Sequence, residues 1–426
     1  MDFESKDIKR SRTSYLAQST VEYFVSLLVT DAFLAKLLTH IGISDSLIGI
    51  ISSFITMAFV IQLISIFIVR LNVSTKRIVI TCDTISIFFF MLLYLVPFIP
   101  VSKEIKTVLV MLSILLAYAG KYTVVSLLFK WANSYVSPSQ RARYSANKEI
   151  ISLVSGMVFT AVIGRIIDKF EGLDNLEGAF LFITIAILIL NISNFICLLM
   201  IKKEDKSEHK ADNEPFSVVL KHTLGNKNFR NVVILTAIWN IARYFTVGFL
   251  GVYKTKDLMM SLFLVQIINI VSNAFRVFVS KPIARYSDRH TYAKGFELGL
   301  ILELMAYIVL IFTTNKTWWL IIVFTILFNC SYAGTNQNSS NITYSYVDSK
   351  YIAQAMAIKN CIGGVFGFAA SLLGGKVLDI IQSNGNMIFG IHIYGQQVLA
   401  GITVVMLIIT LIFTKTVIAK QTVMKQ

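Results

Sequence analysis

The stretch SYVSPSQRARYSANKEI, residues 134–150, returns in part 211 positions later as SYVDSKYIAQAMAIKNC, residues 345–361. An ungapped alignment of residues 134–168 with residues 345–379 gives eleven identities in thirty-five positions. Some are Ile, Val or Ala matches that an apolar composition produces by itself. Others are specific enough to indicate an internal repeat: Tyr135/Tyr346, Lys148/Lys359, Gly156/Gly367, Gly164/Gly375 and Asp168/Asp379.

The composition places the repeat in a membrane. Of the 426 residues, 55% are hydrophobic and only 15% are charged, which is too apolar for a soluble globular protein. Apolar stretches recur that are long enough to cross a bilayer as helices. The pattern predicts an all-α polytopic membrane protein with twelve spans, near residues 15–39, 44–69, 78–100, 107–132, 148–168, 177–201, 230–253, 257–281, 293–314, 317–346, 353–379 and 394–415.

The spans form two sets of six. We predict an N-terminal six-helix bundle over residues 1–201, a polar cytoplasmic linker over 202–229, and a C-terminal six-helix bundle over 230–426. An offset of six spans keeps the direction of crossing, so the repeats are parallel and related by a pseudo-two-fold axis along the membrane normal.

Basic residues predict the orientation. Lys and Arg are more frequent in the N-terminal segment and the loops on its side than in the opposite loops, which predicts that both termini are cytoplasmic. This bias also accounts for most of the net charge of +15, so a nucleic-acid partner is not needed. The first span lacks a cleavage site typical of a signal peptide, and the four cysteines form no metal or disulfide motif. The Ile-, Lys- and Asn-rich composition suggests a bacterial cell membrane.

Two cytoplasmic loops carry motifs of a known family. In SPSQRARYSANKEI, Pro138 and Arg141 stand where that family has Pro and Arg, and KPIARYSDRHTYAK matches its acidic-basic signature at Asp288, Arg289 and Lys294. On these residues and on the twelve spans, the chain resembles the major facilitator superfamily of secondary transporters. It departs from the family at Ala284 and Thr291, where glycines are usual. The fifth span also lacks the Gly-Pro pattern of many drug/proton antiporters.

The resemblance implies two six-helix bundles around a cavity that opens alternately to each side. It also implies an inner gate near the repeated loops. Because Arg141 and Arg143 have Ile352 and Gln354 as counterparts, we expect the first-half loop to supply basic partners that the second-half loop lacks. The candidate gate and motif residues are Arg141, Arg143, Lys148, Asp288, Arg289, Lys294 and Lys359.

Ionisable residues inside spans are costly and mark candidate sites. Arg243 and Lys121 lie about halfway along their spans, and Asp31 lies past the middle of the first span. Aligning the two halves places Asp31 opposite Arg243, so our hypothesis is a buried Asp31–Arg243 pair or a ligand shared between them. The alternative is a structural ion pair that never meets the solute.

Other polar residues accompany these charges. Glu22 lies nine residues before Asp31, on the opposite face of an ideal helix, and is either a cavity or proton site or an interhelical packing partner. Lys121 either binds an anionic group of the solute or makes a structural contact. Trp239 and Asn240 flank Arg243 and would form a mixed aromatic and polar wall, although aromatic residues in spans more often pack.

The tenth span contains a polar run, AGTNQNSSNITYSY, from Ala333. Its amides would lose their hydrogen bonds against lipid, so the run lines water, a ligand or a polar helix interface. Partial lining of a cavity is our preferred interpretation and interhelical packing is the alternative. The amides concerned are Asn336, Gln337, Asn338 and Asn341.

These features favour a transporter over an enzyme, because ATP-binding and hydrolytic motifs are absent. We predict a secondary active transporter of a small polar solute, coupled to protons through Asp31 or Glu22, without metal or cofactor. Its partners would be the solute, protons and the lipid bilayer, and we expect a monomer. The alternatives are a multidrug or lipophilic-compound efflux antiporter, an ion-independent facilitator, and a non-transporting membrane sensor.

Overall fold

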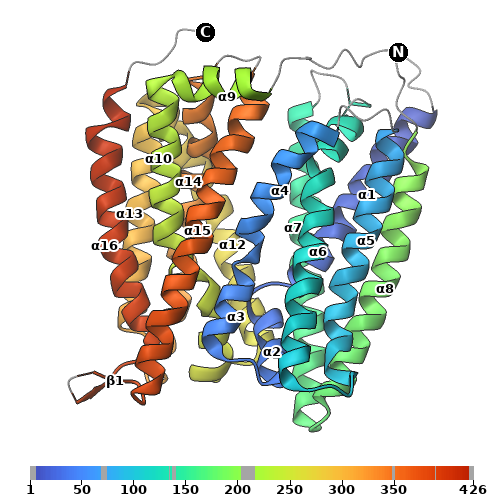
Figure 1. Ribbon diagram of the computed structural model, residues 1–426, viewed down its shortest axis with the longest axis vertical. Helices are drawn as coiled ribbons and strands as arrows, with labels where there is room; N and C mark the ends of the chain where they lie inside the picture. Colours follow the sequence, from blue (N-terminus) through green and yellow to red (C-terminus); the bar gives the residue numbers. More distant parts are fainter. Residues whose placement is uncertain are drawn as a thin grey trace. The chain divides into compact units, whose positions relative to one another are not determined.

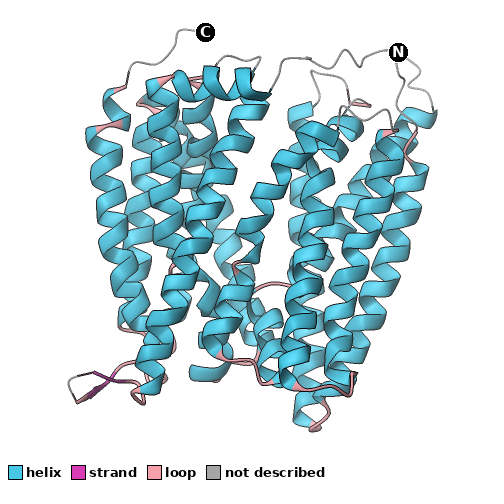
Figure 2. Cartoon of the chain, in the orientation of Figure 1, coloured by secondary structure: helices cyan, strands magenta, loops and turns pink. Residues whose placement is uncertain are grey.

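The computed structural model describes residues 6–68, 74–133, 135–136, 141–202, 216–347, 351–388 and 390–421. Helices make up nearly all of these residues (Figure 2). The strands among them are β1 (Met387–Ile388) and β2 (Ile391–His392), which pair antiparallel as one short hairpin. The described chain is therefore all-α in its framework.

Contacts divide the chain into two compact units. The first comprises Met1–Ile43, Ile61–Asp212 and Ser261–Gln266, and the second comprises Ser44–Val60, Asn213–Met260 and Ile267–Gln426. Each unit thus takes one short segment from the other half of the sequence. The predicted domain boundaries stay a prediction. Residues 203–215 of the predicted linker lie outside the described residues, and the later part of the linker contains the helix α9 (Phe216–Gly225).

The first unit is a bundle in which α5 packs against α6 and α8, while α1 packs against α7 and α8 (Figure 1). Long apolar runs without internal proline explain the length of these helices. The helices of this unit are α1 (Lys6–Leu28), α2 (Asp31–Ile41), α5 (Thr75–Leu95), α6 (Lys103–Asn133), α7 (Arg141–Gly172), α8 (Leu176–Met200) and the second half of α4 (Phe54–Ile68).

The first predicted span is broken at the position of Asp31. Helix α1 ends at Leu28 and α2 begins at Asp31, with a bend of 44° between them, and Asp31 has a φ of 47°. The hydroxyl of Tyr94 donates to the carbonyl of Leu28, and the hydroxyl of Thr30 donates to the carbonyl of Ser26 at 3.0 Å. These bonds satisfy carbonyls at the break. Because the chain changes direction here, Glu22 and Asp31 do not share one straight helix, and the opposite-face expectation does not apply.

The second unit contains the remaining helices. Helix α10 packs against α15 and α16, while α13 packs against α14 and α16 (Figure 1). The elements are α3 (Asp45–Ser52), the first half of α4, α9, α10 (Lys227–Tyr244), the 3-10 turn η4 (Val247–Phe249), α11 (Leu250–Val252), the π-helical turn η5 (Tyr253–Asp257), α12 (Leu262–Arg289) from Ile267 on, α13 (Tyr292–Ile311), α14 (Leu320–Tyr344), α15 (Ile352–Ser383), α16 (Gly395–Thr416) and η7 (Ile418–Lys420).

Glycine allows α13 and α14 to approach closely. A side-chain carbon at Gly334 would lie 2.7 Å from the Cα of Gly299, and one at Gly299 would lie 2.7 Å from the backbone nitrogen of Thr335. Real side-chain carbons do not come so near to backbone atoms. The two helices therefore depend on small residues at this crossing, as helices in membranes often do.

Nine helices in the described part of the chain are long and apolar enough to cross a membrane, and α1 with α2 makes a tenth as one bent span. The other two expected spans correspond to α13 and α14. Helix α13 carries three charged residues, Lys294, Glu297 and Glu303, and the inner half of α14 carries the polar run. Both are helices of 20 residues or more, so their polarity rather than their length sets them apart.

Candidate functional site

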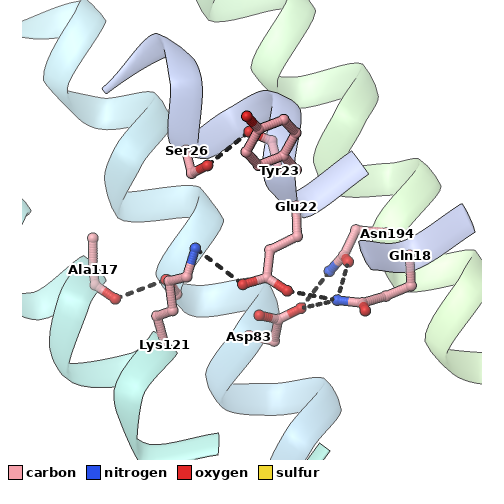
Figure 3. Close-up of polar contacts among 9 residues, drawn as sticks. Gln18, Glu22, Tyr23, Ser26, Asp83, Ala117, Lys121 and Asn194 are labelled. Atoms are coloured by element: carbon pink, nitrogen blue, oxygen red, sulfur yellow. Dashed lines mark hydrogen bonds and ion pairs between the residues drawn. The ribbon is translucent and has the colours of Figure 1, made fainter. Parts of the chain in front are cut away.

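A polar cluster lies inside the first unit, where four helices meet (Figure 3). Its members, here called the first-unit cluster, are Gln18 and Glu22 of α1, Asp83 of α5, Lys121 of α6 and Asn194 of α8. The ammonium of Lys121 lies 3.0 Å from Oε1 of Glu22, and these side chains are 18% and 17% exposed. An ion pair that keeps this much exposure inside spans must face water or a ligand, because lipid would not solvate it.

Amides join the ion pair to a second carboxylate. Nε2 of Gln18 lies 3.1 Å from Oε2 of Glu22, 3.4 Å from Oδ2 of Asp83 and 3.1 Å from Oδ1 of Asn194. Nδ2 of Asn194 donates to the same oxygen of Asp83 at 2.7 Å. Gln18, Asp83 and Asn194 are at most 2% exposed, so this side of the cluster is buried within the unit.

The sequence brings these side chains together by simple means. Gln18 and Glu22 are four residues apart, so they lie on one face of α1. Beside Lys121, a side-chain carbon at Gly120 would lie 2.8 Å from the carbonyl oxygen of Cys82, which shows that α5 and α6 touch at this level. The hydroxyl of Ser86 donates to the carbonyl of Ala117 at 2.7 Å and fixes the same crossing. Close approach at Gly120 therefore places Lys121 near Asp83.

A second cluster lies inside the second unit. Its members, the second-unit cluster, are Trp239 and Arg243 of α10, Glu303 of α13 and Tyr332 of α14. Nε of Arg243 lies 3.4 Å from Oε1 of Glu303, and Nε1 of Trp239 donates to Oε2 of Glu303 at 2.9 Å. The guanidinium lies 4.9 Å from the ring centre of Trp239 and 4.5 Å from that of Tyr332, and it donates to the Tyr332 hydroxyl. Charge, hydrogen bonds and aromatic faces together offset the burial of Arg243.

The predicted pairing of Asp31 with Arg243 joins the two units and stays a prediction. Within the second unit, Arg243 has Glu303 as its acidic neighbour. The sequence alone does not give this pair, because a single span does not reveal which neighbour Glu303 faces. Lys121, for which two roles were open, pairs with Glu22.

The polar run of α14 divides between two environments. Asn336 and Gln337 are exposed, and Asn341 is half-buried, as is Asn240 on α10. Asn338 is 3% exposed and donates from Nδ2 to the carbonyl of Gly334 at 2.8 Å, on the side where α13 crosses. Of these amides, Asn336 and Gln337 are the most exposed.

The repeated lysines both turn into their own units, but toward different partners. Nζ of Lys148 lies 3.0 Å from the hydroxyl of Tyr15 and 4.5 Å from its ring centre. Lys359 is 2% exposed, and its ammonium lies 3.3 Å from Oγ of Ser339 and 3.1 Å from Oγ1 of Thr343. Each lysine thus ties its helix to a neighbour, α7 to α1 and α15 to α14.

The remaining motif residues lie at helix ends. Asp288 and Arg289 are exposed at the end of α12. Lys294 lies 3.1 Å from Glu297, whose other carboxylate oxygen lies 3.1 Å from Lys415 of α16. Arg141 and Arg143 begin α7, and their side chains lie outside the described residues. The predicted gate roles of these residues stay predictions.

Several cluster residues were missed from the sequence. Gln18, Asn194 and Tyr332 are common residue types in apolar helices and carry no charge to mark them. Asp83 is charged, but the third span alone does not reveal which residues it faces. One usable signal was the four-residue spacing of Gln18 and Glu22, which predicts one shared polar face. The spacing of residues along one helix does not predict which residues of other helices they contact.

A sequence profile described as Major Facilitator Superfamily matches residues 15–372, which is most of the chain. The chain belongs to the major facilitator superfamily. None of the curated proteins matches it by sequence.

Solved structures of superfamily transporters share the fold. A variant of the nucleoside transporter NupG superposes with a TM-score of 0.76 at 14% identity, covering 95% of this chain and 99% of that chain. The POT family transporter PepTSo has a TM-score of 0.69 at 10% identity, covering 96% and 98%. A bacterial homologue of the human lysosomal transporter Spinster has a TM-score of 0.67 at 14% identity, covering 97% and 96%. At such identities the likeness shows the fold alone.

This superfamily member is therefore an all-α polytopic membrane protein of the major facilitator fold, as its sequence predicted. The family places it among secondary transporters, which move a solute across a membrane. Both clusters then lie in membrane-spanning helices, where charged side chains are rare and commonly functional.

Proposed function

We propose that the protein is a secondary active transporter of a small polar solute and that transport is coupled to protons. One observation carries this proposal. Glu22 and Lys121 form an ion pair within spans while each keeps nearly a fifth of its side chain exposed. Such surface needs water or a polar ligand beside it. A path lined by this pair favours a polar solute over a lipophilic one.

The exposed amides of the second unit support the same solute class. Asn336 and Gln337 offer both donors and acceptors, and together with Asn240 they could bind hydroxyl, amide or nucleobase groups. Nucleosides and peptides belong in the first set of test solutes, because two of the structural neighbours are transporters named for them.

The chemistry of the ion pair supports proton coupling. A carboxylate beside an ammonium holds its negative charge, and it gains affinity for a proton when the ammonium moves away or binds a solute anion instead. A solute that competes for Lys121 would then change the proton occupancy of the first-unit cluster. In this way the proton gradient could drive movement of the solute across the membrane.

Flux into proteoliposomes tests both parts of the proposal. Nucleosides, amino acids, dipeptides, sugars and a lipophilic cation would be compared, each with and without a pH gradient. We expect accumulation of one polar class to require the gradient, and Glu22→Gln to abolish it. Glu104→Gln, at an exposed acid in the first turn of α6, is the matched control and should keep wild-type flux.

Other outcomes point to the alternatives. Gradient-driven flux that survives neutralisation of both Glu22 and Asp31 would refute coupling through these acids. Flux of a polar solute without any proton movement would identify a facilitator, and transport of the lipophilic cation alone would identify a drug antiporter. Binding without flux in every condition would identify a sensor.

A further inference from the structure

The charges of the first-unit cluster do not balance if both acids are ionised. Glu22 faces Lys121 at 3.0 Å, and Lys148 of α7 adds a second, more distant positive charge near Glu22. Asp83 is contacted by neutral amides, Gln18 of α1 and Asn194 of α8. The charged groups that act on Asp83 are Glu22, which repels a second negative charge, and Lys121, which is already engaged.

Asp83 and Glu22 also differ in how deeply they are buried. Asp83 is 2% exposed, whereas the side chain of Glu22 is 17% exposed. The two carboxylates are bridged by one nitrogen of Gln18, so they lie within two hydrogen-bond lengths of each other. Two adjacent carboxylates, one buried and one partly buried, with a single ammonium in direct contact cannot both remain charged without a large cost. Asp83 is the less exposed acid and forms no ion pair among the described residues, so protonating Asp83 costs less than protonating Glu22.

The hydrogen bonds of Gln18 give an independent indication. Its amide nitrogen has two hydrogens, yet three acceptor oxygens lie within 3.1–3.4 Å of it. Its own carbonyl oxygen is buried and has no hydrogen-bond donor in the described chain. The cluster therefore has too few donors for its acceptors. A proton on Asp83 would convert one acceptor into a donor.

We propose that Asp83 is a proton-binding site: it is protonated at neutral pH, while Glu22 stays charged in its pair with Lys121. Protonated Asp83 neutralises the excess negative charge, and it supplies the donor that the Gln18 network lacks. This proposal rests on the proposed function for its role in transport, since it adds Asp83 to Glu22 as an acid whose proton would move with the solute. The proton site itself is measurable without transport.

Infrared difference spectroscopy on the purified wild-type protein tests the site directly. We expect the carbonyl stretch of a protonated carboxylic acid at neutral pH and its loss as the pH is raised. Labelling all aspartates with ¹³C should shift this band, and labelling all glutamates should not. Asp83→Asn should remove the band, whereas Glu22→Gln should retain it. The wild-type labelling result stands even if a variant fails to fold.

Three results would overturn the proposal: no protonated carboxylic acid at neutral pH, a band that shifts with labelled glutamate, or a band that survives Asp83→Asn. If the carboxylic-acid band is absent and sodium instead stabilises the protein against unfolding, the first-unit cluster binds a metal cation and not a proton. In liposomes, Asp83→Asn should lose proton-driven accumulation, and its remaining exchange should not vary with pH. If the infrared band of protonated Asp83 is present but solute flux through the wild-type protein does not depend on protons, the proton-binding site would be supported. The proposed coupling of transport to protons would be contradicted.

Discussion

At the scale of single residues, the second-unit cluster offsets its buried charges locally. Glu303 is 1% exposed, and it is held by Arg243 from one side and by the indole of Trp239 from another. The indole N–H is a hydrogen-bond donor that few side chains could replace at this position. The stability of the second-unit cluster therefore depends on the indole N–H of Trp239 as well as on its ring.

Trp239→Phe tests that dependence. It keeps an aromatic ring but removes the donor to Oε2 of Glu303, so an acceptor is left unsatisfied inside the unit. We expect the free energy of unfolding to fall by roughly 1–3 kcal/mol, measured by thermal unfolding in detergent. Trp319→Phe, at a side chain that is 54% exposed, is the matched control and should change little. Equal effects of the two substitutions would show that the indole hydrogen bond is not needed.

At the scale of elements, small residues decide which helices can cross closely. Helices α13 and α14 meet at Gly299 and Gly334, and α5 meets α6 at Gly120. The same crossings fix the positions of neighbouring polar side chains, Asn338 in one case and Lys121 in the other. The helix pairs and the polar sites are thus determined by the same contacts.

Gly299→Ala should separate α13 from α14. The added carbon would lie 2.7 Å from the backbone nitrogen of Thr335, and a backbone atom cannot give way as a flexible side chain can. We expect a loss of about 1–3 kcal/mol in unfolding free energy. Gly401→Ala, on α16 with nothing within 4 Å, should instead be neutral or stabilise by about 0.5–1 kcal/mol. Thermal unfolding of both variants decides the matter, and an unchanged Gly299→Ala protein would contradict tight packing there.

The sequence predicted the positions of the helices more successfully than it predicted the contacts between them. Long apolar runs predicted the membrane helices, because length and hydropathy are properties of one segment. The resemblance to the superfamily came from the loop motifs together with these spans. The break before Asp31 was not predicted, since the stretch from Glu22 to Asp31 is continuously helix-compatible and the hydroxyl of Tyr94 that binds the end of α1 comes from a distant segment. The partners of Arg243 and Lys121 were missed for the same reason. Glu303 and Glu22 reach them from other helices, and no spacing within one helix reveals that.

At the scale of the whole molecule, the contacts of α3 tie it to the second unit. Asp45, at the start of α3, is 5% exposed, and its carboxylate lies 2.8 Å from Nζ of Lys256 in η5. Nε2 of Gln382 in α15 donates to the same carboxylate at 2.8 Å. One buried acid thus joins three elements that are far apart in the sequence. Ile48, Ile51 and Phe54 are at most 3% exposed and extend this attachment with apolar burial.

Asp45→Ala should weaken the attachment of α3. It removes an ion pair and a hydrogen bond, while Lys256, which is 53% exposed, can recover its hydration. We expect a loss of roughly 1–3 kcal/mol in unfolding free energy. Asp7→Ala is the control, because Asp7 is 66% exposed and lies 4.0 Å from Lys202; surface pairs of this kind contribute between about 0 and 1 kcal/mol. A similar small change for both would mean that Asp45 does not hold α3.

The exchange of segments between the two units has a consequence for dividing the polypeptide. Residues 44–60 precede the linker but are packed into the second unit, and residues 261–266 follow it but are packed into the first. A fragment that ends in the linker would therefore carry a hydrophobic segment without its binding surface, and the other fragment would carry the empty surface. Each fragment would therefore be incomplete by itself, and the segment missing from each unit would be present in the other fragment. Two halves synthesised as separate chains should therefore recombine through these segments without a covalent link between them.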